Sequence, residues 1–488
     1  MKITYKNLFI FIYTFFILLS LNVNPNNFFS TSLDQKVKIL NIFRFFFPTL
    51  LLIIFIILKK LKLFKSLKSQ NSIISKLIAL FFLFLLLFSL INNFFIPENL
   101  YFILYLNIFA YTYILSNYYN NKIFLKVIIY ILFIYFIYWI LNIAADIFYK
   151  KYSFNNILFN LRILEPHQLN YNYFLGNSNL NSNGVARVLS ILFLIIFSYQ
   201  IFYKKNYINY IFLFSLIILL YSLQSRFAFY SLFFLSLLLI FINNKKKIIG
   251  IFIIILIFMT PVLLNKAFNN KFTYKKTDKD INQIENRYFQ EFNYIIGNDR
   301  LLKKDSNLPT YYESENLINS LHKLGLSQNS IIVLTALNKI TTGRVEIWFN
   351  YVIFKNQTNY FFGLGILSDK ILFSTSISNA LLYAYFTTGM WGSFIYLFVF
   401  TLLLIHFIKY IIYNKSYKLK ITFYVVAIFL LLRSIVESGF LLYGLDLILI
   451  LICLEAVNNQ QNKLNFFKFN FFRFEKNIKK VINEKSIK

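Results

Sequence analysis

The chain has 488 residues, of which 58% are hydrophobic and 21% aromatic, and its formal net charge is +31. A mean hydropathy of +0.60 over this length excludes an ordinary soluble multidomain protein and indicates an integral membrane protein. The charge does not indicate nucleic-acid binding, because no nucleic-acid motif accompanies it. The single cysteine, Cys453, excludes an internal disulfide and a thiolate metal site.

Apolar runs follow one another along the chain, near the ~20 residues that a membrane span needs. The first has a basic start but is followed by NPNN rather than a small-residue cleavage site, which predicts an uncleaved span rather than a signal peptide. The sequence therefore predicts an all-α integral membrane protein with about 12 transmembrane helices. The predicted spans are 7–23, 39–58, 73–91, 99–116, 124–145, 184–203, 207–223, 227–242, 248–264, 385–408, 420–436 and 440–457.

Lysine sets the predicted orientation. With the N-terminus inside, every cytoplasmic connection bears lysine, as the positive-inside rule requires, and both termini are cytoplasmic. This divides the chain into five spans (1–145), a first outer loop (146–183), four spans (184–264), a large outer loop with short helices (265–377), three spans (378–457) and a basic cytoplasmic tail (458–488). We expect the large loop to be either functional or a small subdomain, since it is too long for a plain connector.

Arginine is distributed in the opposite way. Only Arg473 of the nine arginines is cytoplasmic in this topology. Guanidinium groups bind phosphate through two parallel hydrogen bonds, so arginines on one side suggest an anionic ligand there; the alternative is that they extend to lipid headgroups. The outer arginines are Arg44, Arg162, Arg187, Arg226, Arg287, Arg300, Arg344 and Arg433.

The segment TTGRVEIWFNYVIF, at 341–354, predicts a short helix near the end of the large loop. Helical spacing places Arg344, Trp348 and Tyr351 on one face, and Glu346 lies in the first turn, where the helix dipole favours it. A cation beside two aromatic rings suits a sugar pyrophosphate. An interfacial helix with its aromatic residues at headgroup depth is the alternative.

Three further segments predict local structure. FFGLGIL, at 361–367, predicts a tight turn at the membrane interface. In SISNALLYAYFTTGMWG, Ser376 or Ser378 could cap a helix, and Gly389 and Gly392 would let another helix approach. In the last two spans, Arg433 and Glu437 are spaced to pair with each other, and Asp446 is a carboxylate that could pair with an arginine.

Several of these segments resemble the membrane family of O-antigen polymerases and O-antigen ligases, in order and approximate separation, over residues 180–440. NSNGVAR resembles that family's Asn-containing entry to a span, and SRFAF its Ser-Arg segment. TTGRVEIW resembles its Gly-Arg-x-x-x-Trp helix, and GLG and Ser-Asn-x9-Gly-x-x-Gly follow as they do in the family.

The resemblance implies a site on the outer face. Arg226 and Arg344 match arginines that hold the lipid pyrophosphate. Ser378 stands where ligases have a histidine before Asn379; a serine is no general base at neutral pH, which favours a polymerase. The paired Arg-x10-Gly pattern of some polymerases is absent. The catalytic candidates are Arg344, Arg226 and Glu346, with Glu165 and His167 as other candidate bases; the substrate-binding candidates are Arg187, Arg433, Trp348, Tyr351, Ser378, Asn379 and His167.

The implied activity is polymerisation of oligosaccharide repeat units carried on undecaprenyl pyrophosphate, at the outer face of a bacterial inner membrane. Neither a cofactor nor a metal is expected, and the partners are the lipid-linked substrate, the membrane and, as the resemblance allows, a chain-length regulator. An O-antigen ligase is the alternative. A non-enzymatic flippase is a second one, although internal repeats would be expected there rather than a large outer loop.

Overall fold

The computed structural model describes residues 5–20, 35–59, 73–92, 97–118, 121–150, 182–202, 207–223, 225–242, 247–269, 361–368, 377–413, 418–437 and 444–458. It also describes isolated residues elsewhere, among them Arg344, Val345 and Trp348. His167, Glu165, Glu346 and Tyr351 lie outside the described residues, and so do most of the two outer loops and of the tail.

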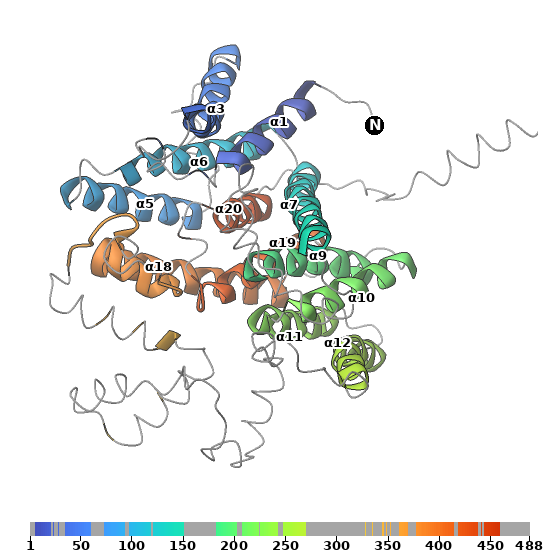
Figure 1. Ribbon diagram of the computed structural model, residues 1–488. Helices are drawn as coiled ribbons and strands as arrows, with labels where there is room; N and C mark the ends of the chain where they lie inside the picture. The colour runs from blue at the N-terminus through green and yellow to red at the C-terminus, as the bar shows by residue number, and fades with distance from the viewer. Residues whose placement is uncertain are drawn as a thin grey trace, which may run out of the picture.

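The described part of the chain is all-helical, as the sequence predicts, and contains no β-strand (Figure 1). Each α-helix overlaps one predicted span, and a short 3₁₀ helix, η1, lies before α6. The elements are α1 (Tyr5–Ser20), α3 (Gln35–Lys59), α5 (Ile73–Asn92), η1 (Pro97–Leu100), α6 (Tyr101–Tyr118), α7 (Asn121–Lys150), α9 (Ser182–Phe202), α10 (Tyr207–Ser222), α11 (Arg226–Ile242), α12 (Lys247–Asn269), α18 (Ala380–Tyr413), α19 (Lys418–Arg433) and α20 (Leu445–Asn458).

Within the part of the chain that the structure describes, four helices are long and apolar enough to cross a membrane: Lys38–Ile57, Ile73–Asn92, Gly184–Phe202 and Ala380–Lys409. Five shorter apolar helices accompany them, and the count of about 12 spans stays a prediction. Several helix ends differ from the prediction: α18 (Ala380–Tyr413) extends beyond 385–408 at both ends, and α20 begins at Leu445, after the predicted start at 440. Gly444 lies directly before α20, and glycine disfavours helix by about 1 kcal/mol relative to alanine.

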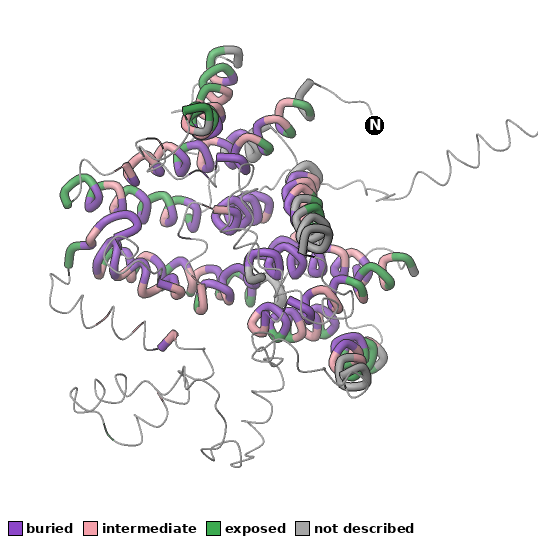
Figure 2. Tube along the Cα trace, in the orientation of Figure 1, coloured by how far each residue is buried: buried purple, intermediate pink, exposed green. Residues whose placement is uncertain are grey.

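The core forms where α9, α19 and α20 meet. α20 packs against α19, α6 and α7, and α9 packs against α10, α11 and α19. Every residue of α20 from Leu445 to Ala456 is buried, and Figure 2 shows this helix enclosed by its neighbours. By contrast, α3 exposes a face of large apolar residues that includes Ile53 and Ile57. A helix that is apolar all round belongs in a protein interior, whereas an apolar outer face suits contact with lipid.

α18 is broken at Gly389, whose φ of 68° and ψ of −158° are not helical. The backbone N–H groups of Leu364 and Gly365 donate to the carbonyls of Phe386 and Thr387, at 3.1 and 3.0 Å. A carbonyl left without a partner in an apolar environment costs several kcal/mol, so these bonds stabilise the break. We call residues 361–368 the strap.

The strap also binds the end of α5. The side-chain amide of Asn92 donates to the carbonyl of Gly363 at 2.7 Å, and the N–H of Ile366 donates to the Ser89 hydroxyl at 2.7 Å. A Cβ atom on Gly363 would lie 1.9 Å from the Thr387 carbonyl oxygen, so only glycine fits there. The predicted turn is thus a connector between α5 and α18.

The sequence predicts that Gly389 and Gly392 of α18 both let another helix approach. In the structure the two glycines have different neighbours. At Gly389 the prediction is wrong, because the close neighbour is the strap: an added Cβ would meet the Phe361 carbonyl oxygen at 2.5 Å. At Gly392 it is confirmed: an added Cβ would first meet the side-chain oxygen of Thr388 on α18 itself, at 1.5 Å, and the nearest atom from another helix is in the ring of Phe81 on α5, at 3.0 Å.

Candidate functional site

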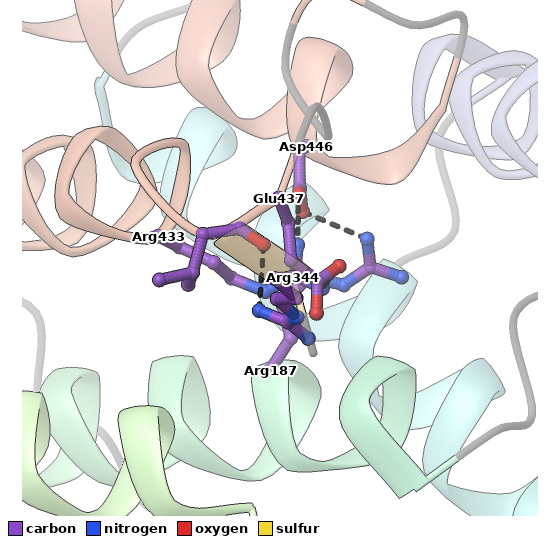
Figure 3. A network of polar contacts seen from close by, with 6 residues as sticks. Arg187, Arg344, Arg433, Glu437 and Asp446 are labelled. Carbon is purple, nitrogen blue, oxygen red and sulfur yellow. Dashed lines mark hydrogen bonds and ion pairs between the residues drawn. The ribbon is translucent and has the colours of Figure 1, made fainter. Parts of the chain in front are cut away.

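Charged side chains from three helix ends meet beside the core. Arg187 lies in the first turns of α9, Arg433 ends α19, and Asp446 lies in the first turn of α20. The Asp446 carboxylate accepts one hydrogen bond from Nη1 of Arg187, at 2.9 Å, and another from Nη1 of Arg433 (Figure 3). Asp446 therefore uses both oxygens to hold two guanidinium groups.

Glu437 and Arg344 extend this group, which we call the arginine cluster (Arg187, Arg344, Arg433, Glu437 and Asp446). Nη2 of Arg433 donates to Oε2 of Glu437 at 2.7 Å, which confirms the predicted pairing. Nη1 of Arg344 donates to the backbone carbonyl of Val436 at 2.8 Å. A residue of the large predicted outer loop therefore reaches the end of α19, beside Glu437 (Figure 3).

The cluster is buried and carries an excess of positive charge. Arg187 and Arg433 are each 6% exposed, and Asp446 is 2% exposed. Three guanidinium groups face two carboxylates, so among the described residues the cluster holds one net positive charge. Charges interact strongly where water is scarce, so the excess charge favours an anion beside the cluster.

The electrostatic surroundings of Arg344 reflect this arrangement. Burial lowers the pKa of its guanidinium, the Glu437 carboxylate raises that pKa, and the Arg433 cation lowers it. Arginine nevertheless stays protonated in proteins, because its ordinary pKa is above 12. Arg344 is thus a permanent cation that interacts with both members of the Arg433–Glu437 pair.

Two buried N–H donors, one in the cluster and one on a residue close to Arg344 in the sequence, have no hydrogen-bond partner among the described residues. They are Nε of Arg187 and Nε1 of Trp348. A buried donor without a partner costs about 1–3 kcal/mol, so natural proteins rarely keep one without a reason. Both donors suit an anionic or hydroxyl-rich ligand.

Asn379 joins the start of α18 to the same region. Its side-chain oxygen accepts from the N–H of Leu382 at 3.0 Å, so the helix cap is Asn379, and the prediction of Ser376 or Ser378 as the cap is wrong. An asparagine side chain offers an oxygen and a nitrogen, and the nitrogen here donates to the carbonyl of Ile435 at 2.7 Å. The adjacent Ala380 N–H donates to the Ser434 carbonyl at 2.9 Å.

The structure thus brings Arg187, Arg344 and Arg433 together, and Asn379 bonds the residue before Val436. Arg226, predicted to be catalytic, begins α11, is half-buried and interacts electrostatically with Tyr230; it takes no part in the cluster bonds given above. Ser378 is half-buried directly before the cap. Among the described residues, no three His, Cys, Asp or Glu side chains gather as metal ligands would.

The sequence-based site omitted Asp446 and Glu437, although both were noted as ion-pair candidates. The signal that could have found them is their position. Both follow a predicted outer end of a span, and a carboxylate at such a depth needs a cationic partner.

Comparison of the chain with protein-family models, with curated proteins and with solved structures gave no match. The function is therefore inferred from the arginine cluster and from the sequence motifs described above.

Proposed function

We propose that this protein is a membrane glycosyltransferase that polymerises oligosaccharide units carried on undecaprenyl pyrophosphate, with the lipid pyrophosphate as the leaving group. The observation that carries the proposal is the arginine cluster. Three arginines that are far apart in the sequence converge at helix ends that lysine placement predicts to be extracytoplasmic.

The cluster suits a pyrophosphate leaving group. Departure of that group develops negative charge, and fixed cations in a site with little water stabilise such charge without reorganising. Asp446 holds the guanidinium groups of Arg187 and Arg433, so their positions are set before a ligand arrives. Trp348, four residues after Arg344 in the sequence, offers a ring for the apolar face of a sugar and an N–H donor that has no partner among the described residues.

A ligase is the first alternative. Ser378 occupies the place of the ligase histidine, and the next residue, Asn379, serves as a helix cap. Neither supplies a general base at neutral pH, which is why we favour the polymerase.

A flippase or other transporter is the second alternative, and the broken helix α18 is the observation that favours it. Discontinuous helices in transporters present free carbonyls to a substrate or ion. Here the carbonyls of Phe386 and Thr387, just before the break, accept hydrogen bonds from the strap. Because these two carbonyls already accept hydrogen bonds, they are not free to bind a substrate or ion, which weighs against transport.

Arg344→Lys tests the proposal. Lysine keeps the charge but loses the planar fork that binds phosphate through two bonds. We expect a deletion strain that carries this variant to lose most polymer on a gel of cell-surface polysaccharide. Arg473→Lys, the same change on the predicted cytoplasmic side, should restore normal polymer.

The pattern on the gel separates the candidate functions. A deletion strain that shows lipid A core bearing one repeat unit fits a polymerase, and bare core with polymer stranded on the carrier fits a ligase. Full-length polymer from Arg344→Lys would remove this residue from the site.

A further inference from the structure

Glu437 is the accessible carboxylate of the arginine cluster. Its side chain is 26% exposed, whereas that of Asp446 is 3% exposed. It lies just beyond the end of α19, next to Val436, whose carbonyl binds Arg344. It is therefore beside two of the guanidinium groups and reachable from the predicted outer face.

The two carboxylates of the cluster differ in how many of their oxygens already accept a hydrogen bond from an arginine. Each oxygen of Asp446 accepts a hydrogen bond from a different arginine. Only Oε2 of Glu437 is engaged, by Arg433, and among the described residues Oε1 accepts no hydrogen bond. An oxygen that keeps a free lone pair and some exposure can reach an incoming hydroxyl group, as a general base must.

We propose that Glu437 is the general base that deprotonates the acceptor sugar, an inference that depends on the proposed function. The acceptor hydroxyl oxygen forms a bond to the anomeric carbon of the donor sugar, and its proton passes to Oε1 of Glu437. The bond between that carbon and the pyrophosphate oxygen breaks, and its electron pair leaves with undecaprenyl pyrophosphate. Glu437 then releases the proton to water.

In this proposal Arg433, Glu437 and Arg344 have different roles. Arg433 holds Glu437 through Oε2, so Oε1 is the oxygen left for the acceptor. Arg344, bonded to the neighbouring carbonyl, faces the developing charge of the leaving group. The base and the carbonyl that holds the cation thus occupy adjacent positions of the chain, 437 and 436, which would bring acceptor and donor within reach of each other.

The test uses the full-length protein in lipid nanodiscs, with lipid-linked oligosaccharide extracted from a strain that lacks the gene. Gln at position 437 keeps an oxygen for Arg433 but cannot take a proton at neutral pH. We expect Glu437→Gln to lower kcat by about 100-fold or more and to change KM by less than about threefold. Glu437→Asp should keep part of the activity, and Glu475→Gln, the same change in the predicted cytoplasmic tail, should keep all of it.

A second variant separates chemistry from structure. Glu437→Ala leaves room for a small carboxylate, and added formate should restore measurable turnover if position 437 supplies the base. A kcat for Glu437→Gln within about threefold of the wild type would overturn the proposal, and so would a lack of rescue in folded Glu437→Ala. In either case an active wild-type protein would leave the proposed function standing, whereas an inactive wild-type protein would refute that function itself.

Discussion

Asp446 is the residue whose removal the structure predicts to be most damaging to stability. Asp446→Asn keeps the size and one acceptor oxygen, but places an NH₂ donor against a guanidinium donor. The described cluster would then hold three cations and one carboxylate. Arg187 would lose its only described carboxylate partner, while Arg433 would keep Glu437.

The magnitude follows from burial. Removing one partner from a buried ion pair typically costs about 3–5 kcal/mol, because the remaining charge is left without compensation. Arg187 is 6% exposed, so little water can reach it in exchange. For a chain of 488 residues, a loss of this size should lower the apparent melting temperature of the purified protein by about 3–5 °C.

A double-mutant cycle identifies the cause. Arg187→Met removes the cation that Asp446→Asn leaves without a partner, and Arg433 still has Glu437. We expect the double variant to be more stable than Asp446→Asn alone, since residues in one ion-pair network are not additive. The measurement is thermal unfolding followed by size-exclusion chromatography in detergent, with activity measured on the same samples.

Two results would refute this reasoning. If Asp446→Asn melts within about 1 °C of the wild type, the two ion pairs do not contribute to stability in the membrane protein. If the double variant shows only the sum of the single losses, Arg187 and Asp446 are not coupled, whatever their distance.

Two further predictions concern the backbone around α18. Gly363→Ala should lower the melting temperature, because its Cβ would lie 1.9 Å from a backbone oxygen; Gly250→Ala, whose Cβ would meet a movable side chain of Ile240 at 3.0 Å, should not. Asn379→Ala should cost about 1–2 kcal/mol through the lost cap and the lost bond to Ile435, whereas Ser378→Ala should cost much less. Equal losses from Ser378→Ala and Asn379→Ala would contradict the assigned cap.

The helices could be predicted because a long apolar run is a local property of the sequence. Each predicted span overlaps one observed helix, from α1 to α20. The packing could not be predicted in this way. α3 and α20 are both predominantly apolar, but α20 is buried from Leu445 to Ala456 and α3 exposes large apolar residues. Only the complete arrangement of helices decides which one is central.

In the candidate site, too, local contacts could be predicted from the sequence and long-range contacts could not. The pair Arg433–Glu437 is four residues apart on one chain segment, so its spacing predicts it. The pair Arg187–Asp446 is 259 residues apart, and nothing in the sequence selects Arg187 from the other predicted outer arginines as the partner of Asp446. The contacts of the strap could not be predicted either. The carbonyls that accept its hydrogen bonds become available only where α18 breaks at Gly389.

The first half of α18, before the break at Gly389, connects the strap to the arginine cluster. At one end Ala380 and Asn379 bond the carbonyls of Ser434 and Ile435, directly before the carbonyl that holds Arg344. At the other end the carbonyls of Phe386 and Thr387 accept hydrogen bonds from the strap. Because a helix is stiff along its axis, displacing the strap should shift the residues that bond Arg344. We therefore expect Gly363→Ala to reduce polymer formation as well as stability, and normal polymer from a destabilised Gly363→Ala protein would show that the strap serves the fold alone.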